Sequence, residues 1–158
     1  MTTRREFLVL ACGAASITAA KTAEAQLEPN QAARRQAALQ EALRKVVGNA
    51  QVRRGKVKLD LPPLIENGNA VPLAVTVESP MTEAHHVRAV HVFTEKNPQP
   101  NVASFHLGPR AGRARVATRV RLADSQTVVA ICELSDGSFW SDSAGIVVTL
   151  AACLEDGI

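Results

Sequence analysis

The sequence has few aromatic residues and no tyrosine. Aromatic side chains make up 3% of the 158 residues, and Trp140 is the one tryptophan. Proteins that bind single-stranded nucleic acid commonly stack bases on aromatic rings, so this composition argues against that class of function. A formal net charge of +3 is also too small to indicate a nucleic-acid surface. We therefore expect no nucleic-acid partner, and a core built from Val, Leu, Ile and Ala.

The sequence also lacks the local motifs of common catalytic sites. It contains no glycine-rich phosphate-binding loop and no nucleophilic serine motif. No carboxylate or thiol accompanies its histidines at the spacing of metal ligands. The four histidines are His85, His86, His91 and His106. We interpret them as surface or hydrogen-bonded residues, and we expect neither a metal nor another cofactor.

Long apolar runs are missing except near the N-terminus. Arg4 and Arg5 precede an apolar stretch at 7–20, and the small-residue sequence "AEA" follows at 23–25. This order is typical of a twin-arginine signal peptide, so we predict a cleaved signal over residues 1–25 and a periplasmic protein. Its removal would leave a net charge of +2. The alternative is an apolar N-terminal helix that is retained. No other stretch has the length of a membrane span, and we expect no membrane partner.

A helix is predicted over residues 28–47, within an N-terminal segment of helix and linker over 26–54. The stretch is rich in Ala, Gln, Leu and Arg, which are good helix formers. Its apolar residues Leu39, Leu43, Val46 and Val47 share one narrow face. Gly48 ends the pattern. We expect this face to pack on the edge of the domain or on a partner.

From residue 55 the hydrophobic period changes to two, with turn signals about every ten residues. This pattern predicts an all-β domain over residues 55–150, folded as an immunoglobulin-like antiparallel β-sandwich. The seven segments that we expect to form strands are 56–61, 71–78, 87–95, 101–107, 113–123, 126–134 and 138–150.

One predicted strand separates two kinds of surface. Along 113–122 one face is cationic and the other is mostly apolar. The cationic face contains Arg113, Arg115, Arg119 and Arg121. A solvated outer face explains the stripe most simply. The alternative is a docking surface for acidic proteins or anionic sulfur groups.

Two cysteines remain after the predicted signal. Alternation within "VVAICEL" places Cys132 in the core, where a cysteine behaves as a small hydrophobic residue. Cys153 follows the last predicted strand and lies only five residues from the C-terminus. An exposed thiol titrates near a pKa of about 8.5 and can attack sulfur or be oxidised. A Cys132–Cys153 disulfide is the alternative.

From Ile65 onward the chain resembles the SoxY family of periplasmic sulfur-carrier proteins. The resemblance lies in "ENGNAVPLAVTVESPMTEA", "VHVFTEKNPQPNVASFHLGPRAG", "RLADSQTVVAICELSDGSFW" and "IVVTLAAC". Members of that family end in a short tail whose cysteine bears the substrate, and Cys153 matches this position. Residues 151–158 would then be the carrier tail.

The resemblance implies a carrier that is not itself an enzyme. A haem enzyme (SoxXA) would join thiosulfate to the thiol, a hydrolase (SoxB) would release sulfate, and a sulfane dehydrogenase (SoxCD) would oxidise the remaining sulfur. The carrier would act as a heterodimer with a SoxZ-like subunit.

The tail departs from the family pattern. The usual tail is Gly-Gly-Cys-Gly-Gly, whereas this chain has "AACLEDGI". Glu155 and Asp156 should raise the pKa of Cys153 and repel anionic thiosulfate. The alternative to a carrier is therefore a SoxY-like interaction module that pairs with a SoxZ-like protein without covalent chemistry.

Overall fold

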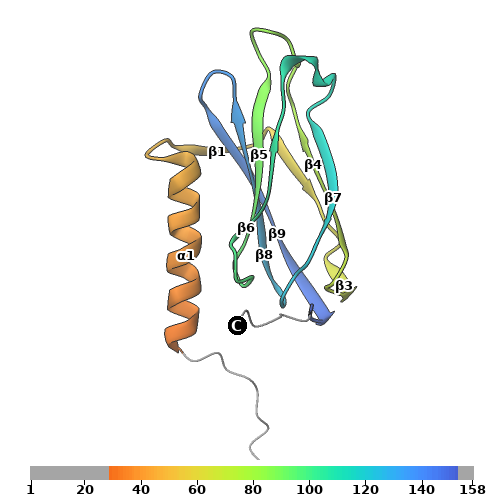
Figure 1. Cartoon of the computed structure of the whole chain (residues 1–158). Helices are drawn as coiled ribbons and strands as arrows, with labels where there is room; N and C mark the ends of the chain where they lie inside the picture. Colours follow the sequence, from red (N-terminus) through yellow and green to blue (C-terminus); the bar gives the residue numbers. More distant parts are fainter. Residues whose placement is uncertain (1–28, 153–158) are drawn as a thin grey trace, which may run out of the picture.

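Alternating buried and exposed residues shape the strands at 57–60, 71–77 and 115–120. The computed structural model describes residues 29–152, which form one long helix and two facing sheets (Figure 1). The predicted signal at 1–25 and Cys153 lie outside the described residues. The strands are β1 (Val52–Arg54), β2 (Val57–Asp60), β3 (Leu64–Asn67), β4 (Val71–Val77), β5 (Val87–Thr94), β6 (Asn101–His106), β7 (Arg115–Val120), β8 (Gln126–Leu134) and β9 (Phe139–Leu150).

The strands form a larger and a smaller sheet. The larger sheet has the order β1-β9-β8-β5-β6, with β3 also paired to β9, and the smaller one has the order β2-β4-β7. Pairing within β2-β4-β7 and β9-β8-β5-β6 is antiparallel. The predicted all-β, immunoglobulin-like sandwich is thus confirmed, and all seven predicted strands are present.

Two further strands were not predicted. Both β1 and β3 pair with β9 in parallel. The strand β1 lies inside the segment that we assigned to helix and linker, and all three of its residues are exposed. The strand β3 has four residues, of which only Ile65 is buried. Neither strand alternates buried and exposed residues, and each pairs with β9 alone.

The core between the sheets consists mainly of valine. Val71, Val75, Val87 and Val128 have no solvent exposure, and Leu122 is equally buried. Branched aliphatic side chains suit the pleated surface of a strand, so a sandwich of this size packs without many aromatic rings. The expectation of an aliphatic core is confirmed.

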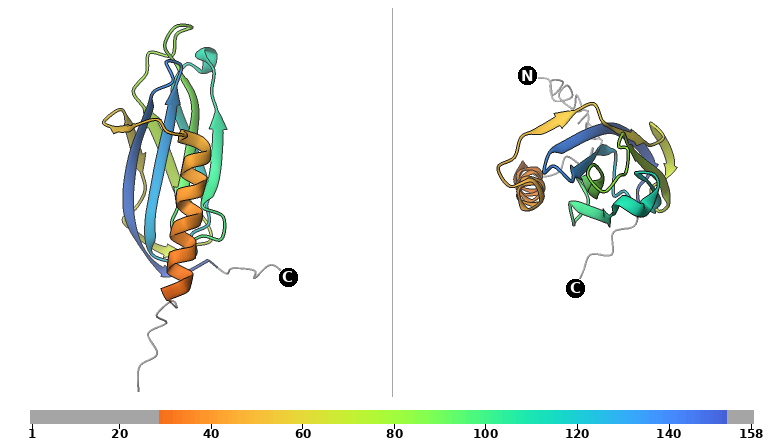
Figure 2. Two further views of the ribbon diagram at one scale, coloured as in Figure 1. Left: turned by 90° about the vertical axis from the view of Figure 1, so that its left-hand side faces the viewer. Right: turned by 90° about the horizontal axis from the view of Figure 1, so that it is seen from above.

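The helix α1 (Pro29–Val47) packs on the outer face of the larger sheet (Figure 2). Leu39 is buried against a second cluster formed by Phe93, Ile131 and Phe139. Two of the few aromatic residues therefore lie under the helix. Gly48 ends the helix with a φ of 60° and donates its N–H to the Arg44 carbonyl at 2.8 Å. Among the described residues, no helix has the length and apolar character needed to cross a bilayer.

Candidate functional site

The candidate carrier residue, Cys153, lies outside the described residues, but the chain immediately before it is described. Strand β9 ends at Leu150, and Ala151 and Ala152 continue from it. Ala151 is exposed, whereas Ala152 is only 5% exposed. The site can therefore be built from the residues that fix Ala152.

Three backbone hydrogen bonds hold this position. Gly68 donates its N–H to the Leu150 carbonyl at 2.8 Å, and Leu122 donates to the Gly68 carbonyl at 2.8 Å. Ala152 in turn donates to the Leu122 carbonyl at 3.1 Å. Three segments that are distant in sequence thus meet at the end of β9. The residue that directly precedes Cys153 is anchored to the sandwich.

This junction requires a glycine at position 68. A Cβ atom there would lie 2.5 Å from the Leu122 carbonyl oxygen and 2.9 Å from the Ala152 nitrogen. Both distances are shorter than real Cβ contacts, and both involve backbone that cannot rotate away. The sequence indicated Asn67-Gly68 as a turn, but no local signal showed that Gly68 contacts two other segments.

A groove opens beside the anchored residue, between β6 of the larger sheet and β7 of the smaller one. Its volume is about 480 Å³, and Ala152 forms part of its wall. Val102, Ala103 and Val120 contribute apolar surface, and Arg119 and Arg121 contribute guanidinium groups. We refer to it as the β6–β7 groove. It places two cations of the predicted stripe next to the end of β9.

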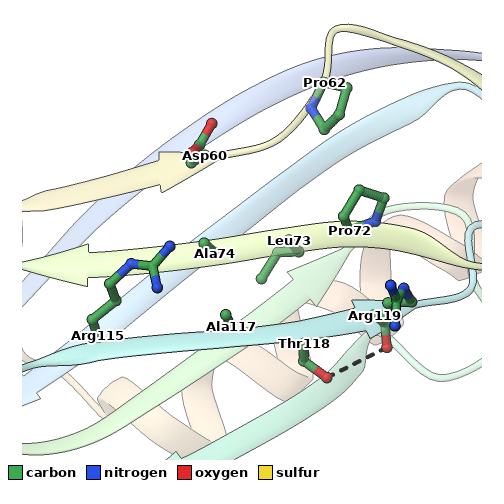
Figure 3. A pocket seen from close by; sticks show the side chains of 9 residues that line it. All are labelled: Asp60, Pro62, Pro72, Leu73, Ala74, Arg115, Ala117, Thr118 and Arg119. Carbon is green, nitrogen blue, oxygen red and sulfur yellow. Dashed lines mark hydrogen bonds between the residues drawn. The ribbon is translucent and has the colours of Figure 1, made fainter.

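The whole cationic stripe faces outward, as the alternation of residues predicted. Ala114, Val116, Val120 and Leu122 are buried, whereas all four arginines of the stripe are exposed. Ala74 and Ala117 pair across β4 and β7, and these small side chains leave a hollow of about 750 Å³ between Arg115 and Arg119 (Figure 3). Arg119 lines both the hollow and the β6–β7 groove, Arg121 lines the groove alone, and Arg113 lines neither.

Cys132 lies in the core, as predicted. It has no solvent exposure, its thiol is free, and burial raises its pKa to about 12. Cys132 pairs with Trp140 at the start of β9, whereas Ala152 lies beyond the other end. A strand of 12 residues spans about 40 Å, and a disulfide requires Cα atoms within about 7 Å. This separation argues against an internal bridge between Cys132 and the tail.

Two of the four histidines lie close together. His91 on β5 and His106 on β6 have ring centroids 6.2 Å apart, and Nδ1 of His91 lies 2.8 Å from Oγ of Ser104. Burial, and then the nearby His106, lower the pKa of His91. His86 places Nδ1 3.2 Å from the Thr82 carbonyl. Within residues 29–152, no three His, Cys, Asp or Glu side chains come together as metal ligands.

Comparison with protein families identifies the chain. The family model described as "Sulfur oxidation protein SoxY" matches residues 43–153, and its match therefore extends through Cys153. The chain belongs to the SoxY family. No curated protein sequence matches the chain significantly.

Solved structures agree with this assignment. The sulfur carrier protein SoxY from Chlorobium limicola f thiosulfatophilum is similar to this chain, with 25% identity and a TM-score of 0.61, over 73% of this chain and 99% of that one. A superoxide reductase from Ignicoccus hospitalis has 18% identity and a TM-score of 0.53, over 60% of this chain and 80% of its own. A superoxide reductase from Nanoarchaeum equitans has 11% identity and a TM-score of 0.51, over 61% of this chain and 100% of its own. The two reductases share only the fold with this SoxY-family chain.

Proposed function

We propose that this protein is a periplasmic sulfur-carrier subunit of a Sox-type thiosulfate-oxidising system, and that it holds sulfur intermediates covalently on Cys153. The main support is the family match, which extends through Cys153, together with the likeness to a sulfur carrier protein over nearly its whole length. The arginine-arginine sequence and apolar run at 1–25 support export.

The proposed chemistry begins with the Cys153 thiolate. A two-electron oxidation joins its sulfur to the sulfane sulfur of thiosulfate and forms Cys–S–S–SO₃⁻, while a SoxXA-type haem enzyme accepts the two electrons. Water then attacks the terminal sulfone, which leaves as sulfate with release of two protons, and a persulfide remains on the cysteine. A SoxB-type hydrolase performs this step, and a SoxCD-type enzyme oxidises the persulfide sulfur. The protein itself presents the intermediate and acts as a heterodimer with a SoxZ-like subunit.

The described structure is compatible with such a role at three points. Cys132 is buried with a raised pKa, so it does not compete as a nucleophile at neutral pH. Cys132 lies on β8 opposite Trp140, near the start of β9, whereas the tail follows the other end of β9, and this separation argues against an internal bridge. Ala152 is anchored at the rim of the β6–β7 groove, which sets the root of the tail at the surface of the sandwich.

The test is peptide mass spectrometry on the full chain with its SoxZ-like partner. The complex is incubated with isotopically labelled thiosulfate and a SoxXA-type enzyme, then digested without reductant. We expect labelled sulfur on the peptide that contains Cys153, and we expect a reductant to remove it.

Two variants control this experiment. Cys153→Ser should abolish the label, whereas Cys132→Ala should retain it. If the Cys153 peptide stays unlabelled while a known SoxY–SoxZ pair is labelled under the same conditions, the carrier role is wrong. The alternative, an interaction module without covalent chemistry, then remains, and it requires that Cys153→Ser still binds the SoxZ-like subunit and supports thiosulfate oxidation.

A further inference from the structure

The β6–β7 groove is an open side of the sandwich. The strands β6 and β7 are the last strands of their respective sheets, and they do not pair with each other. The side chains of Val102 and Ala103 pack partly against the core from this edge. An uncovered edge of this kind exposes apolar surface that another segment can bury.

Two cations border the apolar wall. Arg119 and Arg121 both line the groove and are exposed. Among the described residues, neither guanidinium group forms an ion pair. The backbone that holds them is fixed, because Asn97 donates a side-chain hydrogen bond to the Arg121 carbonyl at 2.7 Å and accepts one from Ala123 at 3.0 Å. The groove therefore offers an apolar wall and two unneutralised positive charges in a defined arrangement.

The chain leaves the described structure at this groove. Ala152 lines it, and six residues follow. Those residues begin with Cys153 and continue with Leu154, Glu155 and Asp156, which are one apolar and two acidic side chains. Six extended residues reach at most about 20 Å, so they can cover the groove beside their own root.

We propose that the tail docks in the β6–β7 groove, with Leu154 on the apolar wall and Glu155 and Asp156 paired with Arg119 and Arg121. Exposed ion pairs are weak one by one. The tether compensates for this weakness, because it keeps the carboxylates at a high effective concentration beside the arginines. The arginines also offset the two negative charges that would otherwise repel an anionic substrate. The tail then has two states, one docked in the groove and one released from it.

Zero-length carbodiimide coupling tests the proposal, because it joins a lysine amine to a carboxylate only where the two are in contact. Arg121→Lys and Arg119→Lys keep the positive charge and supply the amine. In the full chain at low salt, we expect peptides that link residue 119 or 121 to Glu155 or Asp156. The yield should fall at least fivefold in 0.5 M salt, where screening is strong.

Arg113→Lys is the matched control. It belongs to the same cationic stripe but lies eight residues before Arg121, about 26 Å along an extended chain, and does not line the groove. Glu155→Gln combined with Asp156→Asn should remove the links in the Arg121→Lys background. Equal coupling at positions 113 and 121, no coupling at 119 and 121, or links found only between two copies of the chain would each overturn the proposal. Docking is independent of sulfur loading, so an unlabelled Cys153 with strong coupling would reject the carrier role alone.

Discussion

At the scale of single residues, Cys132 and Gly68 show how the surrounding structure determines what one side chain can do. Cys132 has no contact with solvent, and its thiol stays protonated because burial disfavours the thiolate. Gly68 has space for a hydrogen but not for a methyl group. Burial keeps the Cys132 thiol from acting as a nucleophile. The missing side chain at Gly68 permits the junction that holds Ala152.

The pKa of Cys132 predicts a dependence of stability on pH. The unfolded chain releases this proton near the ordinary value of 9.0, whereas the folded protein holds it to about 12. Below pH 9 both states are protonated, so the group has no effect. Between pH 9 and 12 the unfolded state alone is ionised, and the free energy of unfolding falls by at most about 1.4 kcal/mol per pH unit. Urea unfolding across this range should show a smaller decline for Cys132→Ala than for the parent, and equal declines would contradict the assignment.

Gly68→Ala should destabilise the domain by about 1–3 kcal/mol, because the new methyl group would push apart the three segments that meet there. The measurement is the midpoint of urea unfolding, followed by far-UV circular dichroism. Gly145→Ala is the matched control, since a Cβ atom at Gly145 meets nothing within 4 Å. Similar midpoints for the two variants would show that the junction tolerates the extra atoms.

At the scale of elements, the helix and β9 depend on the sandwich in different ways. The helix attaches through one narrow apolar face, with Leu39 against Phe93, Ile131 and Phe139. Strand β9 is paired on both sides, with β8 on one side and with β1 and β3 on the other. The strand that leads to Cys153 is therefore paired with other strands along most of its length.

Leu39→Ala should lower the free energy of unfolding by about 2–3 kcal/mol, because it removes the buried side chain of the helix from its contact with the sheet. Gln40→Ala, one position along on the exposed face, should change it by less than about 0.5 kcal/mol. Chemical unfolding of both variants checks the pair. If Leu39→Ala behaved like Gln40→Ala, the helix would not be part of the cooperative fold.

Local patterns in the sequence predicted the elements that have strong periodicity or strong end signals. The helix begins and ends within one residue of the prediction, because its composition and Gly48 both mark it. Strand β8 and the burial of Cys132 followed from alternation alone. The strands β1 and β3 and the β6–β7 groove could not be predicted in this way. Each exists only because segments distant in sequence come together, and no spacing within a single segment records that.

At the scale of the whole molecule, a side-chain hydrogen bond connects the two sheets. Asp142 on β9 of the larger sheet accepts the N–H of Leu59 through Oδ2 at 2.8 Å. Leu59 lies on β2, which is the edge strand of the smaller sheet. The carboxylate therefore satisfies a backbone donor on an edge strand that has no further strand beside it.

Asp142→Ala should reduce the free energy of unfolding by about 1–3 kcal/mol, because the Leu59 N–H would lose its charged acceptor. Asp60→Ala provides the control, since Asp60 is exposed on the same edge strand. Thermal unfolding by calorimetry measures both variants. A loss of the same size at Asp60 would mean that charge on this edge, and not the hydrogen bond between sheets, is responsible.

The anchoring of Ala152 has a consequence for any enzyme that acts on the next residue. One peptide unit spans about 3.8 Å between Cα atoms, so a group bound to Cys153 would stay close to the anchored Ala152. A long flexible arm could enter a deep tunnel while the rest of its protein stayed outside. If Cys153 carries the substrate as proposed, an enzyme that acts on it therefore needs a shallow, wide cleft that admits the end of the β domain itself.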